Sequence, residues 1–225
     1  MAEQKSSWET FAPDGNIRGC AMIVAHPDDE TLWAGGTILM HPEVRWTIVS
    51  LCRKSDRERA ARFFQAMEYL GAWGQMGDLD DGPEQLPLVE KEFEDAIMSL
   101  LPCARFDLII THSLCGEYTR HKRHEETAKA VCELWKSGRL SARQMWMFAY
   151  EDDGGKKLPE PIREADLSVK LSDDIWRKKY HTITKIYGFG PDSFEAKAAG
   201  REEAFWCFGV GDNVERRLKN RSKEK

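Results

Sequence analysis

The chain alternates short apolar runs with longer amphipathic stretches, and this alternation limits the folds that it can adopt. Apolar runs of strand length, each ended by polar residues, cover 20–25, 46–51, 107–111 and 144–149. Uninterrupted apolar runs of this kind are typical of parallel strands that are covered on both faces. Stretches with a helical spacing of apolar residues lie between or after them, at 56–70, 89–101, 124–135 and 173–187.

Strands that alternate with helices in this way predict an α/β fold, namely a Rossmann-like three-layer sandwich around a mostly parallel sheet. With 225 residues, of which 41% are hydrophobic, the chain is long enough for a single domain with one sizeable core. We expect that domain to cover residues 1–214, with long loops at 78–87 and 152–161. Residues 215–225 are highly charged, and we expect them to form a flexible tail.

Composition limits the kinds of partner that the protein can bind and the cellular compartment in which we expect it. The formal net charge of -5 disfavours a protein that coats nucleic acid. No two of the six cysteines are spaced as CxxC, which favours reduced, buried thiols over a cysteine-built zinc site or a disulfide framework. Residues 1–16 contain no apolar signal-peptide core, and the longest apolar runs are far too short to span a bilayer. These patterns predict a cytoplasmic protein with no membrane span and no nucleic-acid partner.

Two polar clusters follow predicted strands, at the edge where an open parallel sheet binds its ligands. His-Pro-Asp-Asp-Glu at 26–30 follows the first strand directly, and His-Lys-Arg-His at 121–124 follows the third strand after a loop. A catalytic zinc ion takes three protein ligands and keeps one position for water. His26, Asp29 and His124 can supply that ligand set, and we expect them to meet at one point.

Two further residues of these clusters suit acid–base chemistry. Asp28 lies in the same turn as Asp29 and would be free to accept a proton from the attacking water. His121 precedes His124 by about one helical turn, and as an imidazolium it could stabilise an oxyanion and protonate the departing amine. The structural alternative is that Asp28 or Asp29 caps a helix and that the histidine pair begins a solvated helix. We favour the site because both clusters fall where this fold builds its active sites.

These residues resemble the PIG-L/LmbE-like family of zinc-dependent N-acetylglucosaminyl de-N-acetylases. The segment AHPDDETLWAGGTI at 25–38 is similar to the first metal motif of that family, and THSLCGEYTRHKRHEET at 111–127 is similar to the second. A helix that ends Ala66-x-x-x-Leu70-Gly71 resembles the segment between the two motifs. The resemblance covers roughly the first 135 residues. It implies a Zn²⁺ cofactor and a small N-acetylated sugar or glycoconjugate as substrate, and it is compatible with a homo-oligomer.

Matched by position, the resemblance implies His26, Asp29 and His124 as metal ligands, Asp28 as general base and His121 as acid. It also implies two substrate contacts. The substrate-binding arginine of the family falls on Arg59, with Arg57 as an alternative. The sugar-binding aspartate falls on Asp81, with Asp78 or Asp80 as alternatives because the loop before it is one residue longer than usual.

The chain departs from the family between the two histidines of the second motif, where it has Lys122 and Arg123 in place of the more usual proline and acidic residue. One hypothesis is that these cations favour a substrate with a carboxylate or phosphate group. The alternative is that both side chains point to solvent.

Two other function classes compete with a deacetylase. A metal-dependent phosphoesterase on the same scaffold would usually hold two metal ions, and the three obvious ligands of this chain favour one. A non-catalytic metal-binding module would not need Asp28 and His121, which are surplus to holding a metal. The turn after the first strand is not GxGxxG, which disfavours dinucleotide binding. Iron, cobalt or manganese could bind the same ligands as zinc.

Overall fold

The fold is built on a seven-stranded sheet with the order β3-β2-β1-β4-β5-β9-β8. The computed structural model describes residues 17–118 and 121–221. The first five strands in that order are parallel, and β9 runs antiparallel to both of its neighbours. The strands are β1 (Gly19–Val24), β2 (Arg45–Cys52), β3 (Trp73–Leu79), β4 (Leu108–Thr111), β5 (Gln144–Phe148), β8 (Leu167–Lys170) and β9 (Glu202–Gly209).

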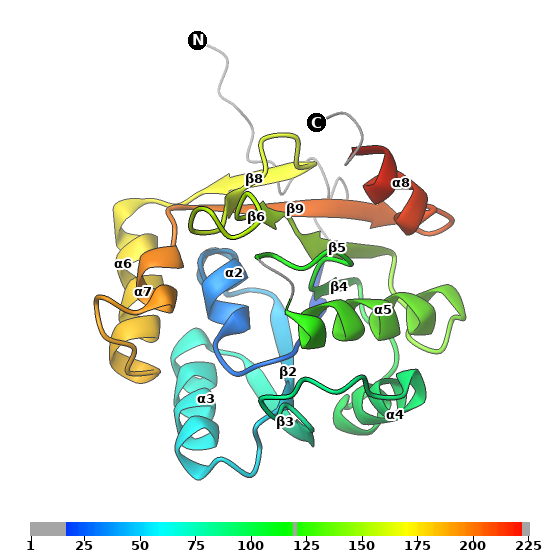
Figure 1. Cartoon of the computed structure of the whole chain (residues 1–225), viewed down its shortest axis with the longest axis horizontal. Coiled ribbons are helices and arrows are strands. Elements are labelled where there is room, and N and C mark those ends of the chain that lie inside the picture. The colour runs from blue at the N-terminus through cyan, green and yellow to red at the C-terminus, as the bar shows by residue number, and fades with distance from the viewer. Residues whose placement is uncertain (1–16, 119–120, 222–225) are drawn as a thin grey trace.

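Helices cover both faces of this sheet (Figure 1). One core lies between the sheet and α2 (Asp29–Met40), α3 (Arg57–Leu70) and α6 (Asp173–His181). The other lies between the sheet and α4 (Glu90–Leu100), α5 (Lys122–Lys136) and α8 (Val214–Arg221). Successive residues of β1 pack into the two cores in turn, which explains why that strand is apolar throughout. The predicted α/β three-layer sandwich with a mostly parallel sheet in a single domain is confirmed.

Local chemistry fixes several helix ends. The side chain of Asp56 accepts a hydrogen bond from the backbone N–H of Arg59 and so caps α3 at its start. Gly71 ends the same helix in the left-handed conformation, with φ at 69°, which glycine adopts without steric cost. Ser172 caps α6 in the same way as Asp56 caps α3. The predicted helix over 173–187 is divided, since α6 continues as a π-helical turn, η1 (Thr182–Ile186).

The structure departs from the sequence predictions mainly in the second half. Strands β3, β8 and β9 were not predicted, and the predicted loop over 152–161 contains part of a short hairpin formed by β6 (Tyr150–Glu151) and β7 (Glu160–Pro161). The flexible tail expected from residue 215 is wrong up to residue 221, because α8 crosses the expected boundary and buries Leu218. A short helix, α7 (Phe194–Ala198), precedes β9.

The strand order places the two polar clusters at the same edge. Strands β1 and β4 are neighbours, although α2, β2, α3, β3 and α4 separate them in the chain. The order reverses between them, because β2 lies on one side of β1 and β5 lies beyond β4. Such a switch point, beyond the carboxyl ends of the strands, is where open α/β sheets bind ligands. No helix within the described ranges is long and apolar enough to cross a bilayer.

Candidate active site

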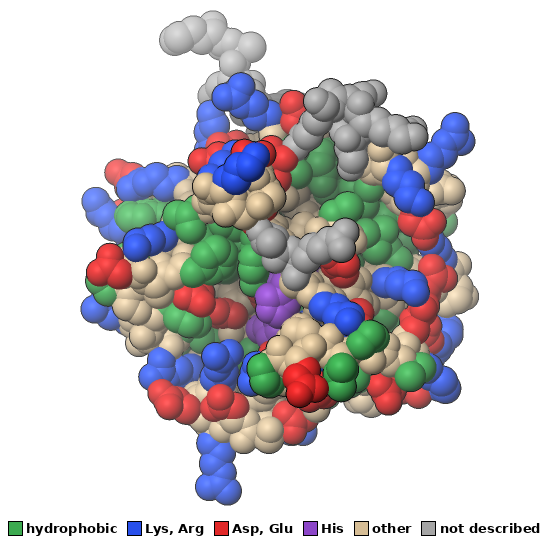
Figure 2. Space-filling model, viewed as in Figure 1, with side chains coloured by type: hydrophobic (Ala, Val, Ile, Leu, Met, Phe, Trp, Pro, Cys, Tyr) green, Lys and Arg blue, Asp and Glu red, His purple; other side chains and the backbone are tan. Residues whose placement is uncertain are grey.

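Three side chains converge at the carboxyl ends of β1 and β4, as predicted. Nδ1 of His26 lies 3.3 Å from Oδ2 of Asp29 and 3.2 Å from Nε2 of His124. The same oxygen of Asp29 lies 3.4 Å from Nε2 of His124, so the three atoms form a nearly equilateral triangle. All three residues are buried, and histidine side chains are visible at the bottom of the hollow near the centre of the face in Figure 2.

The size of this triangle fits a metal ion. Zinc binds histidine nitrogen and carboxylate oxygen at about 2.0–2.1 Å, so two ligands of a tetrahedral ion lie about 3.3 Å apart. The three measured separations, 3.2, 3.3 and 3.4 Å, agree with that value. His26, Asp29 and His124 therefore have the donor types and the spacing to hold zinc and to leave a fourth position for water.

Glu117 fixes the orientation of His124. It is completely buried and accepts hydrogen bonds from Nδ1 of His124 at 2.7 Å and from Nδ1 of His112 at 2.9 Å. A carboxylate only accepts, so the proton of the His124 ring lies on Nδ1 and the lone pair of Nε2 points into the triangle. The pKa of Glu117 falls to about 2: burial opposes this shift, but the two histidines outweigh it.

His112 lies beside the triangle, but the lone pair of its Nε2 already accepts a hydrogen bond. Its ring stacks on that of His124, and its Nε2 accepts a hydrogen bond from the backbone N–H of Ala25 at 3.0 Å. Nε2 of His112 is also 3.4 Å from Oδ2 of Asp29, which makes an alternative ligand group of Asp29, His112 and His124 possible in spacing alone. We favour His26 as the third ligand because its Nδ1 bonds no backbone group within residues 17–118 and 121–221.

The two neighbouring carboxylates of the first cluster have opposite electrostatic surroundings. Burial tends to raise the pKa of both. For Asp28, the charges of Asp29, Glu30 and Glu195 add to that effect, and its pKa lies well above the usual value despite the opposing charge of Arg59. For Asp29, the nearby histidines outweigh burial, and its pKa lies well below the usual value. Divergence of this kind is typical of a pair in which one carboxylate stays charged and the other exchanges a proton.

The backbone of Asp28 is held in an unusual conformation. Its φ is 121°, which costs free energy in any residue except glycine. Its N–H donates to Oε2 of Glu30 at 3.0 Å, and the hydroxyl of Tyr187 donates to the other oxygen of Glu30 at 2.7 Å. Asp28 precedes α2, yet its side chain makes no capping hydrogen bond. The structural alternative for Asp28 is therefore wrong, and its carboxylate has no hydrogen-bond donor among the described residues.

His121 lies at the same place as the triangle. Its ring centroid is 4.5 Å from that of His124 and 4.6 Å from that of His26. It occupies the N-cap position of α5 without a side-chain capping bond, and its Nδ1 is buried without a partner in the described part of the chain. Burial, with the charges of His124 and His26, lowers the pKa of His121 to about 4.

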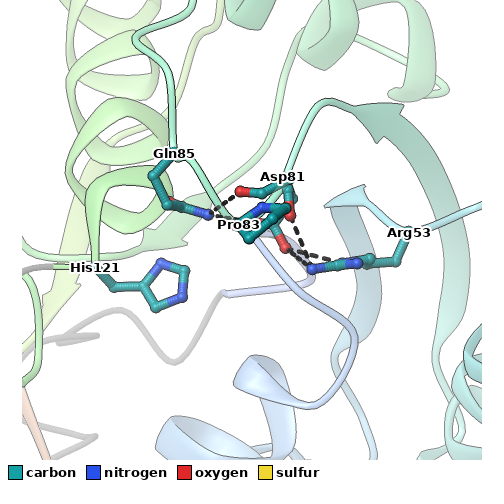
Figure 3. Close-up of a pocket in the computed structure, with 6 residues that line it drawn as sticks. Arg53, Asp81, Pro83, Gln85 and His121 are labelled. Atoms are coloured by element: carbon teal, nitrogen blue, oxygen red, sulfur yellow. Dashed lines mark hydrogen bonds and ion pairs between the residues drawn. The ribbon is translucent and has the colours of Figure 1, made fainter.

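A cavity of about 340 Å³ opens beside this centre (Figure 3). It shares His121 with the centre, and its other lining residues come from the ends of β2 and β3. They are Arg53, Asp81, Gly82, Pro83 and Gln85. Pockets for small ligands start at about 300 Å³, so this cavity is the right size for one small ring.

Of the three candidate aspartates, Asp81 is the one that reaches the cavity. Its Oδ1 lies 3.3 Å from Nε2 of His26, although that nitrogen has no hydrogen bond of good geometry to a described residue. Gln85 and Arg53 donate to its two carboxylate oxygens. Asp78 instead accepts from Ser55 on the exposed side of the loop.

The remaining candidates lie outside the cavity. The side chain of Asp80 is 62% exposed and lies 3.5 Å from Arg123. Arg59 is half-exposed, with its Nε 3.6 Å from Asp56, and Arg57 is exposed. Arg59 is nevertheless close enough to Asp28 to affect the pKa of that carboxyl.

The hypothesis that Lys122 and Arg123 select an acidic substrate is wrong for this structure, and so is the alternative that both point to solvent. Arg123 is fully buried and donates to the carbonyl oxygens of Asp80 and Leu86 and to Glu126. Lys122 donates to the carbonyl oxygen of Gln85 at 3.0 Å. Both cations hold the loop that follows β3, and they do not line the cavity.

Sequence reasoning missed Arg53 and Gln85 as parts of this region, and it placed a loop around Tyr187 over the site without a role for that residue. Arg53 follows β2 directly, so its position at the carboxyl end of a parallel strand next to β1 was a usable signal. Gln85 lies in a loop without a pattern. Tyr187 reaches Glu30 from 157 positions along the chain, and only the packing of η1 against α2 brings the two together.

The sequence also matches a family model. The PIG-L model, described as GlcNAc-PI de-N-acetylase, matches residues 21–135, which include both metal motifs. Among curated proteins, the chain is 21% identical over 178 residues to the uncharacterized protein L374 of Acanthamoeba polyphaga mimivirus. That match covers 72% of this chain and 75% of the viral protein.

Several solved structures share the fold. N,N'-diacetylchitobiose deacetylase from Pyrococcus horikoshii superposes with a TM-score of 0.64 at 16% identity, covering 88% of this chain and 86% of that one. The zinc-inhibited form of teicoplanin deacetylase Orf2 gives 0.60 at 12% identity, with 87% and 100% covered. GalB, the 4-carboxy-2-hydroxymuconate hydratase from Pseudomonas putida, gives 0.57 at 15% identity, with 88% and 98% covered. The fold therefore hosts more than one chemistry, and the reaction has to be argued from the site.

Proposed function

Because the chain belongs to the PIG-L family, we propose that it is a zinc-dependent hydrolase that removes the acetyl group from an N-acetylated amino sugar of the N-acetylglucosamine type, or from a similar small amide. The observation that carries this proposal is the triangle of His26, Asp29 and His124, beside which the Asp28 carboxylate accepts no hydrogen bond from a described residue. Two structural neighbours with deacetylase in their names support the reaction class.

His26, Asp29 and His124 would hold the metal ion. When bound, the ion supplies a Lewis acid that polarises the amide carbonyl and lowers the pKa of water towards about 7. Glu117 would keep the lone pair of His124 available to the ion, and the charge on Asp29 suits a cation better than a neutral carboxyl would.

Asp28 would act as the general base. Asp28 is half-buried, its carboxylate accepts no hydrogen bond from a described residue, and its pKa is raised, so it can take the proton of the attacking water and later release it. The strained turn and the bond to Glu30 hold it beside the ligands, so little freedom is lost when the water and the amide bind.

His121 would act on the other side of the reacting carbonyl. A ring that is neutral at pH 7 can still donate one hydrogen bond to the oxygen on which negative charge develops. That charge favours uptake of a proton from solvent by the ring, after which His121 can pass a proton to the departing nitrogen. The protons balance over one turnover: Asp28 accepts one from the water and releases it to solvent, and His121 takes one from solvent and gives it to the amine.

The test is metal analysis combined with an amine-release assay on N-acetylglucosamine and N,N'-diacetylchitobiose. We expect about one zinc ion per chain, and amine and acetate released together. Asp28→Asn should keep the metal and lose about 10²- to 10⁴-fold in kcat, the usual contribution of a general base. Glu43→Gln, an exposed acidic position at the opposite edge of the sheet, should leave both unchanged.

Each competing function predicts a different result. A phosphoesterase would bind metal and cleave p-nitrophenyl phosphate but no acetamide. A binding module would hold metal, cleave neither substrate, and be insensitive to Asp28→Asn. Loss of metal in Asp28→Asn would contradict the assignment of Asp28 as a base that does not bind the ion.

A further inference from the structure

We propose that Arg53 is a specificity-determining residue, which donates a hydrogen bond to a neutral hydroxyl oxygen of the sugar ring in the cavity beside His121. This inference rests on the proposed function and deepens it, because it assigns the sugar ring to this cavity and names a side chain that recognises one of its hydroxyl groups. Arg53 lies outside the two metal motifs, and it is not Arg59, the arginine that the family resemblance implies as a substrate contact.

The backbone of Arg53 is fixed in a strained conformation. Its φ is 70°, in the left-handed region that favours glycine. The residues on both sides are tied to neighbouring strands: the N–H of Cys52 donates to the carbonyl of Ala25, and that of Lys54 donates to the carbonyl of Gly77, each at 3.0 Å. Strain that the surroundings maintain in this way is commonly found at functional positions. The side chain of Arg53 is thereby directed along the edge of the sheet where His26 lies.

Arg53 and Asp81 both line the cavity and form a clamp in which the guanidinium is the more exposed partner. Nε of Arg53 donates to Oδ2 of Asp81 at 2.8 Å, and Nη2 donates to the backbone carbonyl of Asp81 at 2.9 Å. The side chain of Arg53 is 39% exposed, whereas that of Asp81 is 5% exposed. Nη1 of Arg53 makes no hydrogen bond to a described residue. The clamp thus leaves donor N–H groups of Arg53 for a ligand, whereas both carboxylate oxygens of Asp81 already accept hydrogen bonds from Arg53 and Gln85.

The charge balance favours a neutral ligand over an anion. Oδ2 of Asp81 lies 2.5 Å from Nη2 of Arg53, so the carboxylate neutralises the guanidinium at close range. Lys122 and Arg123 do not line the cavity, because the loop carbonyls and Glu126 bind them. The site therefore offers donors without net positive charge, which suits a hydroxyl better than a carboxylate or a phosphate.

The position of the cavity links this contact to the reaction. Figure 3 shows the guanidinium of Arg53 and the ring of His121 on opposite sides of the cavity, with Asp81 and Pro83 between them. A ring held by Arg53 can place its acetamide group towards His121 and the triangle of ligands. A volume of about 340 Å³ takes one ring and leaves further substituents outside.

The test compares Arg53→Met and Arg53→Lys with wild type on two substrates, methyl N-acetylglucosaminide and an acyclic N-acetyl amine without hydroxyls. A hydrogen bond from a charged donor is worth a change of about 10- to 100-fold, so Arg53→Met should raise KM for the sugar by that factor. The acyclic amide should be hydrolysed at an unchanged rate, and zinc affinity should stay within about threefold, since Gln85 still donates to Asp81. Arg45→Met, an exposed arginine at the other end of β2, should change nothing.

Deoxy analogues of the glycoside identify the hydroxyl. For one deoxy analogue, the kcat/KM of wild type should fall by about as much as the kcat/KM of Arg53→Met falls on the full sugar. On that same analogue, Arg53→Met should have about the same kcat/KM as on the full sugar. Arg53→Lys should recover part of the loss. If Arg53→Met weakens both substrates equally, or lowers zinc affinity tenfold or more, Arg53 acts only through Asp81 and the inference fails.

The inference remains testable if wild type releases no amine and the proposed function fails. Binding of methyl N-acetylglucosaminide and methyl glucosaminide to the zinc-loaded protein can then be measured by calorimetry. Binding that is weakened at least tenfold by Arg53→Met, and not by Arg45→Met, supports the contact. Equal binding by the two variants, or no binding to wild type, overturns it.

Discussion

Nδ1 of His124 donates to Glu117 at 2.7 Å, and through this bond Glu117 sets the direction of a proposed metal ligand. The carboxylate also accepts from His112 and from the backbone N–H of Ser113, so its own position is fixed on three sides. Glu117 therefore both orients a histidine and holds the loop that follows β4.

Glu117→Gln tests the importance of this bond. The amide is uncharged and can turn an N–H towards the ring, so we expect the affinity for zinc to fall by about 10- to 100-fold. Competition with a chromogenic chelator measures the change. Glu125→Gln, one residue after His124 on α5, serves as the control because no hydrogen bond joins Glu125 to these histidines. Equal affinities of wild type and Glu117→Gln would show that His124 is oriented by packing alone.

Metal removal should lower thermal stability. A ligand that binds only the folded state at 100 times its dissociation constant adds about 2.7 kcal/mol. For a chain of this size that corresponds to a fall in Tm of roughly 5–11 °C when a chelator strips the metal. Scanning calorimetry with and without added zinc measures the change. The Tm of His124→Ala should not respond to zinc, and a zinc-dependent shift in that variant would contradict the ligand assignment.

A buried ion pair far from the cavity makes a separate prediction about stability. Glu203 accepts from Nζ of Lys179, the N–H groups of Gly36 and Thr37, and the hydroxyl of Thr37, each at 2.7 Å. Glu203→Gln leaves the buried ammonium without a counter-charge, so we expect a loss of about 3–5 kcal/mol in the free energy of unfolding. Lys179→Met should cost less, because the carboxylate keeps three donors. Urea denaturation gives both values.

The control for that pair is an exposed one. Lys91 and Asp95 form an ion pair on the surface of α4, and Lys91→Met should cost at most about 1 kcal/mol. If Glu203→Gln were no more destabilising than Lys91→Met, or if Lys179→Met were the more damaging of the two core changes, Glu203 would not be the acceptor that ties α2 to β9.

The sequence determined the architecture and the cluster of candidate metal ligands. Buried parallel strands must be apolar on both faces, so the runs at β1, β2, β4 and β5 could be read directly, and the strand ends marked the edge where His26 and His124 lie. The histidines and carboxylates of each motif follow one of those strands in the chain, and the two motifs meet because β1 and β4 are neighbours in the sheet.

Only the tertiary structure decided the surroundings of that cluster. Asp81 reaches His26, and Tyr187 reaches Glu30, through contacts between segments that lie far apart in the chain. The charge of Arg123 looked available from its place beside His124, but the carbonyl groups of a folded loop bind it, whereas Arg53 was turned to the cavity by a backbone conformation that no pattern encodes. Local sequence specifies which groups are present at a strand end, and burial and long-range hydrogen bonds specify which of them remain free to meet a substrate.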